Sequence, residues 1–170
     1  MTDLSATTRH LHEKLSTEEG VYGVILVSGL LAVAGVSEAS AIHTLVLTAV
    51  TILVFWAAHV YAGTVARHGK LSHGAVVGLR RAFRQSVTHA RGFLVSTILP
   101  GLVLIAGAFG LIEDALALWI GLWVNVGVLG FLGYVSYRRK SAPFSMRVFG
   151  AVATASFGLL IVIVKAIVTH

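Results

Sequence analysis

The 170-residue chain contains no cysteine, only 2 prolines and few charged residues. Without cysteine it has no disulfide framework, no thiolate nucleophile and no cysteine-based zinc site. Charged residues make up 12% of the chain and hydrophobic residues 56%, whereas soluble domains carry roughly 25% charged residues. This composition excludes a water-soluble monomer and indicates a protein that lies in a membrane.

Long apolar runs dominate the rest of the sequence. A helix needs roughly 17 to 25 mostly apolar residues to cross a bilayer, and five runs approach or reach this length. They lie at about 21–36, 42–66, 92–112, 115–137 and 148–169. The third run contains Pro100, which removes a backbone donor and predicts a kink. We therefore expect an all-α membrane protein, a bundle of five transmembrane helices, with residues 21–170 as a single transmembrane domain.

The basic residues give the orientation of this bundle. Cytoplasmic segments of membrane proteins are enriched in Lys and Arg. With a cytoplasmic N-terminus, 12 of the 13 Lys and Arg residues fall on the inner side and only Lys165 on the outer side. The inner residues are Arg9, Lys14, Arg67, Lys70, Arg80, Arg81, Arg84, Arg91, Arg138, Arg139, Lys140 and Arg147. We predict an N-in/C-out protein of the cell membrane, in which Lys165 extends to the outer interface.

Residues 1–20 precede the first span and form a polar segment. They lack the long apolar core of a cleavable signal peptide. Leu4, Thr8, Leu11 and Leu15 recur at spacings of three and four, the spacing of an amphipathic helix that lies on a membrane. We predict a cytoplasmic N-terminal segment.

The connection between the second and third spans has the pattern of a basic amphipathic helix over about 74–91. Its apolar stripe consists of Val76, Leu79, Phe83, Val87 and Ala90. Its basic residues are Arg80, Arg81, Arg84 and Arg91, which we expect to bind anionic lipid headgroups of the cytoplasmic leaflet. They lie outside the apolar runs, which disfavours a voltage sensor. No known nucleic-acid-binding motif accompanies them, so nucleic acid is not an expected partner.

Few polar residues fall within the spans or at their ends. Ionisable side chains are costly there and by default mark a functional site. Glu18 and Glu19 begin the first span and His59 lies near the inner end of the second, so a contact between Glu19 and His59 is geometrically allowed. Tyr22 is a neighbouring hydrogen-bonding group. A structural alternative is that Glu19 caps the first helix and His59 binds a carbonyl or a headgroup.

Asn125 is an amide halfway along the fourth span, and it either hydrogen-bonds another helix or lines a pore. Gly127, Gly130 and Gly133 follow it, and glycines at such spacings favour close helix packing. Metal and enzyme motifs are missing from the sequence: there is no H-E-x-x-H, no Walker A and no G-x-G-x-x-G. We expect no metal, no cofactor and no enzymatic activity.

Two functions fit this sequence. The first is a small channel or proton-linked transporter of ions or small solutes, acting as a homo-oligomer because five short helices enclose little aqueous space. Glu18, Glu19, Tyr22, His59 and Asn125 are the transport or gating candidates. The second is a non-catalytic structural or accessory subunit that organises lipids or a membrane partner. The acid pair and the histidine at one membrane depth favour transport.

Overall fold

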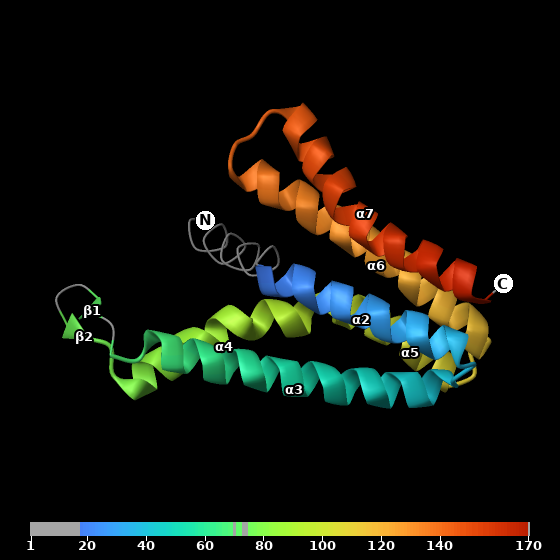
Figure 1. Ribbon diagram of the computed structural model, residues 1–170, viewed down its shortest axis with the longest axis horizontal. Coiled ribbons are helices and arrows are strands. Elements are labelled where there is room, and N and C mark those ends of the chain that lie inside the picture. Colours follow the sequence, from blue (N-terminus) through green and yellow to red (C-terminus); the bar gives the residue numbers. More distant parts are fainter. Residues whose placement is uncertain (1–17, 70, 73–74, 170) are drawn as a thin grey trace, which may run out of the picture.

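The computed structural model of this protein describes residues 18–69, 71–72 and 75–169, and it is almost entirely helical. Four helices are long and apolar enough to cross a membrane (Figure 1). They are α2 (Glu18–Val36), α3 (Ala41–Arg67), α6 (Asp114–Arg139) and α7 (Phe144–Thr169). Of the predicted N-terminal segment 1–20, residues 1–17 lie outside the described residues. The last three residues belong to the first turn of α2.

Local sequence explains where these helices begin and end. The Ser40 hydroxyl accepts a hydrogen bond from the backbone N–H of His43 and caps α3. Asp114 lies in the first turn of α6 and Arg138 in its last turn. Both charges are favourable there, because a helix carries partial positive charge at its N-terminus and partial negative charge at its C-terminus.

The predicted third span is divided between two helices. α4 (Leu79–Ser96) and α5 (Ile98–Ala108) meet at an angle of 48°. Counted together they give a fifth candidate span, so the described chain has four or five. The break falls at Thr97 because Pro100 has no N–H to donate to the Ser96 carbonyl, four residues earlier. The Thr97 hydroxyl instead donates to the carbonyl oxygen of Leu94 at 2.8 Å.

The helix predicted over about 74–91 begins later and extends further than expected. Leu71–Ser72 and Ala75–Val76 form a short antiparallel pair of strands, β1 and β2. Helix α4 starts only after Gly78. It runs on past Arg91 into the residues that were assigned to the third span. The predicted boundary between a surface helix and a membrane helix at 91–92 is therefore absent.

Helix α4 lies between α2 and α3 and contacts both (Figure 1). Its buried side chains are Ala82, Ser86, Ala90 and Phe93. Leu79 and Phe83 of the predicted stripe are exposed, whereas Ala90 is buried. The side of α4 that packs inward carries Ala82, Ser86 and Ala90, and small side chains of this kind let helices approach closely.

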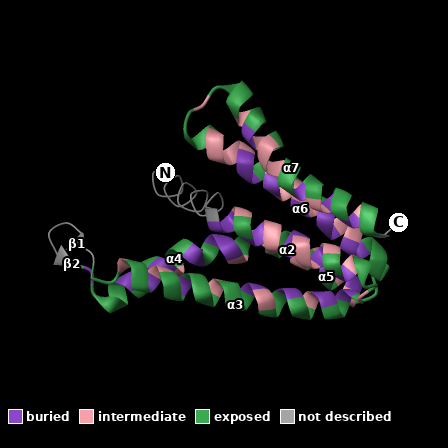
Figure 2. Cartoon of the chain, in the orientation of Figure 1, coloured by how far each residue is buried: buried purple, intermediate pink, exposed green. Residues whose placement is uncertain are grey.

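Helices α2 and α6 are central, and α3 and α7 are peripheral. In the apolar stretch of each helix, 44% of the residues of α2 and 39% of those of α6 are buried. The corresponding fractions are 22% for α3 and 17% for α7. Figure 2 shows the exposed residues along the outer sides of α3 and α7. These outer sides are rich in Val, Leu, Ile and Phe. An apolar exterior of this kind supports a protein that lies in a membrane.

Candidate functional site at the Glu19 end of the bundle

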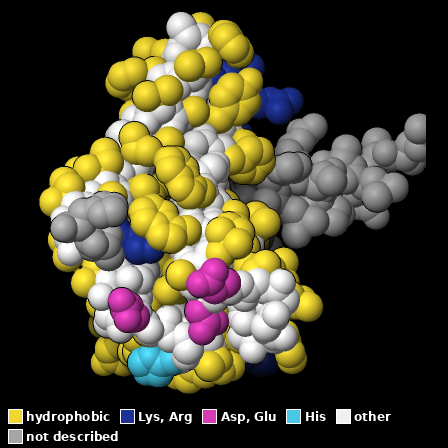
Figure 3. Space-filling view, turned by 90° about the vertical axis from the view of Figure 1, so that its right-hand side faces the viewer, with side chains coloured by type: hydrophobic (Ala, Val, Ile, Leu, Met, Phe, Trp, Pro, Cys, Tyr) yellow, Lys and Arg dark blue, Asp and Glu magenta, His cyan; other side chains and the backbone are white. Residues whose placement is uncertain are grey.

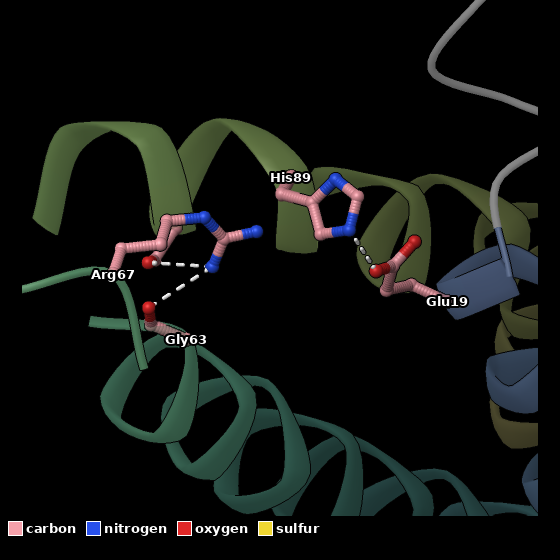
Figure 4. A network of polar contacts seen from close by, with 5 residues as sticks. Glu19, Gly63, Arg67 and His89 are labelled. Carbon is pink, nitrogen blue, oxygen red and sulfur yellow. Dashed lines mark hydrogen bonds and ion pairs between the residues drawn. The ribbon is translucent and has the colours of Figure 1, made fainter. Parts of the chain in front are cut away.

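Glu19 lies in the first turn of α2 and is buried, with its side chain 7% exposed. Its Oε1 lies 2.6 Å from Nε2 of His89 on α4, and the His89 side chain is 55% exposed. Glu19 Oε2 is also buried, and no group among the described residues hydrogen-bonds it. Figure 4 shows the imidazole directed at the carboxylate. A half-exposed histidine thus connects solvent to a carboxylate inside the bundle.

Arg67, at the end of α3, makes a second polar contact with α4. Its Nη1 donates to the Gly63 carbonyl oxygen at 3.0 Å and to the Ser86 hydroxyl at 3.1 Å. The Ser86 hydroxyl in turn donates to the Ala82 carbonyl oxygen at 2.9 Å. Because Ser86 and His89 lie three residues apart on α4, polar contacts cross from α3 to α2 over one side of this helix (Figure 4).

Glu19 contacts His89 and not His59, the partner that the sequence allowed, because α4 lies between α2 and α3. His59 instead packs its ring against Phe93, with centroids 5.5 Å apart. Tyr22 is 52% exposed, on the outside of α2. The Glu18 side chain lies outside the described part of the structure. Of the predicted transport residues near this end, only Glu19 takes part in the polar contact described here.

His89 is a candidate site residue that the sequence analysis did not single out. The sequence feature that indicates its position is the spacing of the small residues Ala82, Ser86 and Ala90, which follow one another at intervals of one helical turn. Small residues at such spacing mark a close helix contact, and His89 borders that face of α4.

Asn125 is fully buried on α6, and neither its Oδ1 nor its Nδ2 has a hydrogen-bond partner among the described residues. Its depth follows from its neighbours. Gly121 lies against Leu31 and Leu129 packs with Val24, so Asn125 is level with Ser28 on α2. The Ser28 hydroxyl, also buried, donates to the Val24 carbonyl oxygen at 2.8 Å. Ser28 and Asn125 are therefore buried polar residues at the same depth, midway along the bundle. We call a depth at which polar side chains lie inside the bundle a polar level.

The opposite end of the bundle holds a cavity of about 620 Å³. Three carboxylates line it, together with a lysine and a tryptophan. These residues are Glu38, Glu113, Asp114, Lys165 and Trp119. Figure 3 shows acidic side chains gathered on this end of the molecule. The expectation that Lys165 extends to the interface was wrong, because this residue is only 3% exposed and its Nζ lies 3.9 Å from the centre of the Trp119 ring.

The three glycines that follow Asn125 differ in their surroundings. A Cβ at Gly133 would overlap Gly150 and Thr154 of α7, so Gly133 lies in a tight helix contact. Gly130 faces Ala155 at ordinary van der Waals distance. Gly127 has no atom near its Cβ position and lines an apolar groove with Val95, Ile98 and other residues of α4 to α6. Gly127 therefore contacts no other helix among the described residues, and its predicted packing role stays a prediction.

Arg80, Arg81, Arg84 and Arg91 are exposed on α4. The first three line a groove at the start of this helix, and Arg91 lies two turns further on. In the described part of the chain no three His, Asp or Glu side chains come together as metal ligands would. Comparison with protein-family models, curated proteins and solved structures finds no match to this chain.

Proposed function

We propose that this protein is a channel or proton-linked transporter, acting as an oligomer, in which Glu19 and His89 exchange protons at one end of the bundle. The observation that carries the proposal is the buried carboxylate of Glu19 in contact with a half-exposed imidazole. Keeping an acid inside a membrane bundle is costly, and such residues commonly mark proton or ion pathways. Histidine is the side chain that most readily changes charge between pH 5 and 8.

The contact supports a proton transfer between two defined atoms. A protonated imidazole hydrogen-bonds Glu19 Oε1 through its Nε2–H. Transfer of that proton leaves a neutral imidazole and a neutral carboxylic acid. The imidazole then takes up another proton from solvent. The buried Oε2 provides a second acceptor position on the inner side of Glu19.

Two further polar levels lie beyond Glu19. Ser28 and Asn125 form the first, about 14 Å along α2 from Glu19 at 1.5 Å per residue. The cavity beside Lys165 forms the second. Between Glu19 and Ser28 the side chains of Val24 and Val27 are fully buried in the apolar core. An apolar barrier between polar levels favours a gated transporter over a permanently open pore.

The experiment is proton flux into liposomes that contain the purified protein and a pH-sensitive dye, driven by a potassium diffusion potential. We expect wild-type flux above empty liposomes. Glu19→Gln should abolish it, because the amide keeps a hydrogen bond to His89 but does not titrate. His89→Ala should reduce it strongly, because the carboxylate loses the imidazole that would deliver protons to it.

His43→Ala is the matched control, since His43 is an exposed histidine at the other end of α3. It should retain wild-type flux. Size-exclusion profiles of all variants report whether each is folded. Folded wild-type protein that carries no protons, sodium, potassium or chloride contradicts the proposal, and equal flux in Glu19→Gln and wild type contradicts the role of Glu19.

An accessory subunit is the second candidate, and the open groove beside Gly127 favours it. The groove has a volume of about 560 Å³ and lies between α4, α5 and α6, with apolar lining residues such as Ile98, Val124 and Phe131. A neighbouring helix with a protruding apolar side chain fits such a groove. The detergent-corrected mass separates the candidates: a homo-oligomer supports the transporter, and a stoichiometric foreign subunit supports the accessory role.

A further inference from the structure

The start of α4 carries a basic groove of about 690 Å³. Its lining residues are Gly78, Leu79, Arg80, Arg81, Arg84 and Gln85. The first N–H groups of a helix have no acceptor within the helix and attract anions. The first turn of α4 contains no acidic residue. Three arginines and a helix start therefore present one positive site to a ligand.

A second groove, of about 250 Å³, runs along α3. Its lining residues are Trp56, Ala57, Val60, Tyr61, Thr64 and Phe83. It is almost wholly apolar, since the Thr64 hydroxyl already donates to the Val60 carbonyl oxygen. The Nε1 of Trp56 is buried without a hydrogen-bond partner among the described residues. An elongated apolar ligand suits this groove.

The two grooves adjoin through α4. Leu79 lines the basic groove and Phe83 lines the apolar one, and residues four apart on a helix share a face. Both side chains are more than half exposed. Arg67 contacts Ser86 and His59 contacts Phe93, so α3 and α4 run antiparallel. The apolar groove consequently extends from the arginines toward the middle of the α3 span.

We propose that these two grooves together bind one anionic phospholipid. Its phosphate lies among Arg80, Arg81 and Arg84, and one acyl chain follows α3 from Phe83 toward Trp56. The arginines select a negative headgroup, and the apolar groove requires a chain, which a free phosphate lacks. The occupant is thus a membrane lipid, held at a defined position instead of by a diffuse basic surface. This inference does not depend on the proposed transport activity.

The test uses quenching of Trp56 fluorescence by phospholipids with bromine atoms in the acyl chain. Trp119→Phe and Trp123→Phe leave Trp56 as the only tryptophan. The protein is reconstituted in vesicles of unlabelled phosphatidylcholine that contain a minor fraction of brominated phosphatidylglycerol or, in parallel, of brominated phosphatidylcholine. We expect preferential quenching by phosphatidylglycerol, with about a fivefold contribution from each arginine.

Arg80→Ala with Arg84→Ala should remove this preference, while Arg138→Ala, an exposed arginine at the end of α6, should keep it. Ala57→Leu fills the apolar groove and should reduce quenching by either lipid, which provides a second test if the double arginine variant does not fold. Equal quenching by the two lipids overturns the headgroup site. Quenching by neither lipid overturns the acyl groove and indicates that protein covers it, as in a contact between two copies.

Discussion

An ionisable side chain is buried near each end of α2, Glu19 at one end and Lys165 of α7 at the other, but the surroundings of the two side chains differ. Glu19 contacts a histidine that is half exposed, so solvent reaches the carboxylate through one titratable group. Lys165 lies on the face of Trp119 and against Gly35, at the edge of a cavity with three carboxylates. The first arrangement suits proton exchange, whereas the second fixes a positive charge in one place. The protein is therefore asymmetric along its length.

The largest expected effect on stability concerns the site in which the Lys165 side chain lies. A Cβ at Gly35 would overlap Cε and Nζ of Lys165. We expect Gly35→Leu to destabilise the protein by about 2 kcal/mol, within the usual range for overpacking, because the end of the Lys165 side chain can move aside only by giving up its contact with Trp119. Thermal unfolding in detergent measures the change. If Lys165 is fixed as described, Lys165→Ala should restore part of this loss in the double variant.

Gly29→Leu is the matched control for Gly35→Leu. Gly29 lies on the same helix and has no atom near its Cβ position, so the larger side chain meets open space and replaces a poor helix former. We expect its unfolding temperature to equal or exceed that of wild type. Equal losses at Gly29 and Gly35 would remove the argument for a fixed Lys165.

A smaller effect is expected at the other end. His89→Ala deprives the buried Glu19 carboxylate of its described partner, which costs about 1 to 2 kcal/mol, since the exposed imidazole is screened and water replaces it. His89→Gln, whose amide can still donate a hydrogen bond to Glu19, should lose less stability than His89→Ala. Thermal unfolding of the two variants in detergent tests this.

His59→Ala is the comparison for His89→Ala. His59 packs against Phe93 and is not the histidine that contacts Glu19. His59→Gln should therefore recover no stability relative to His59→Ala. Recovery in His59→Gln with none in His89→Gln would reverse the assignment and place His59 beside Glu19.

The sequence predicted the long helices well because charged or polar residues, such as Arg67 and Arg139, mark where each of these apolar runs ends. It did not predict that α4 packs between α2 and α3. That arrangement depends on contacts between residues far apart in the chain, such as Arg67 with Ser86 and Glu19 with His89. Periodicity identified an apolar stripe on α4 but not the second side, with Ala82, Ser86, Ala90 and Phe93, that packs against the other helices.

Lys165 shows the same limit of sequence reasoning. A lysine near the end of a span commonly extends its ammonium group to the interface. In this protein Gly35 and Trp119, each more than 40 residues away in sequence, create a place for it inside the bundle. Charge counting along the sequence therefore did not indicate which charge is enclosed.

The smallest expected effect on stability is at Asn125, midway between the two ends. Its amide is buried and makes no hydrogen bond to the described residues, so Asn125→Leu removes an unpaired polar group and should change stability by less than about 1 kcal/mol, or raise it. If protons pass by way of the Asn125 amide between Glu19 and the cavity beside Lys165, the same variant should lose proton flux in liposomes while it remains folded. Leu122→Met, a substitution at a fully buried apolar position one turn away, should keep both stability and flux. Retained flux in Asn125→Leu would mean that the two ends are not connected through this residue.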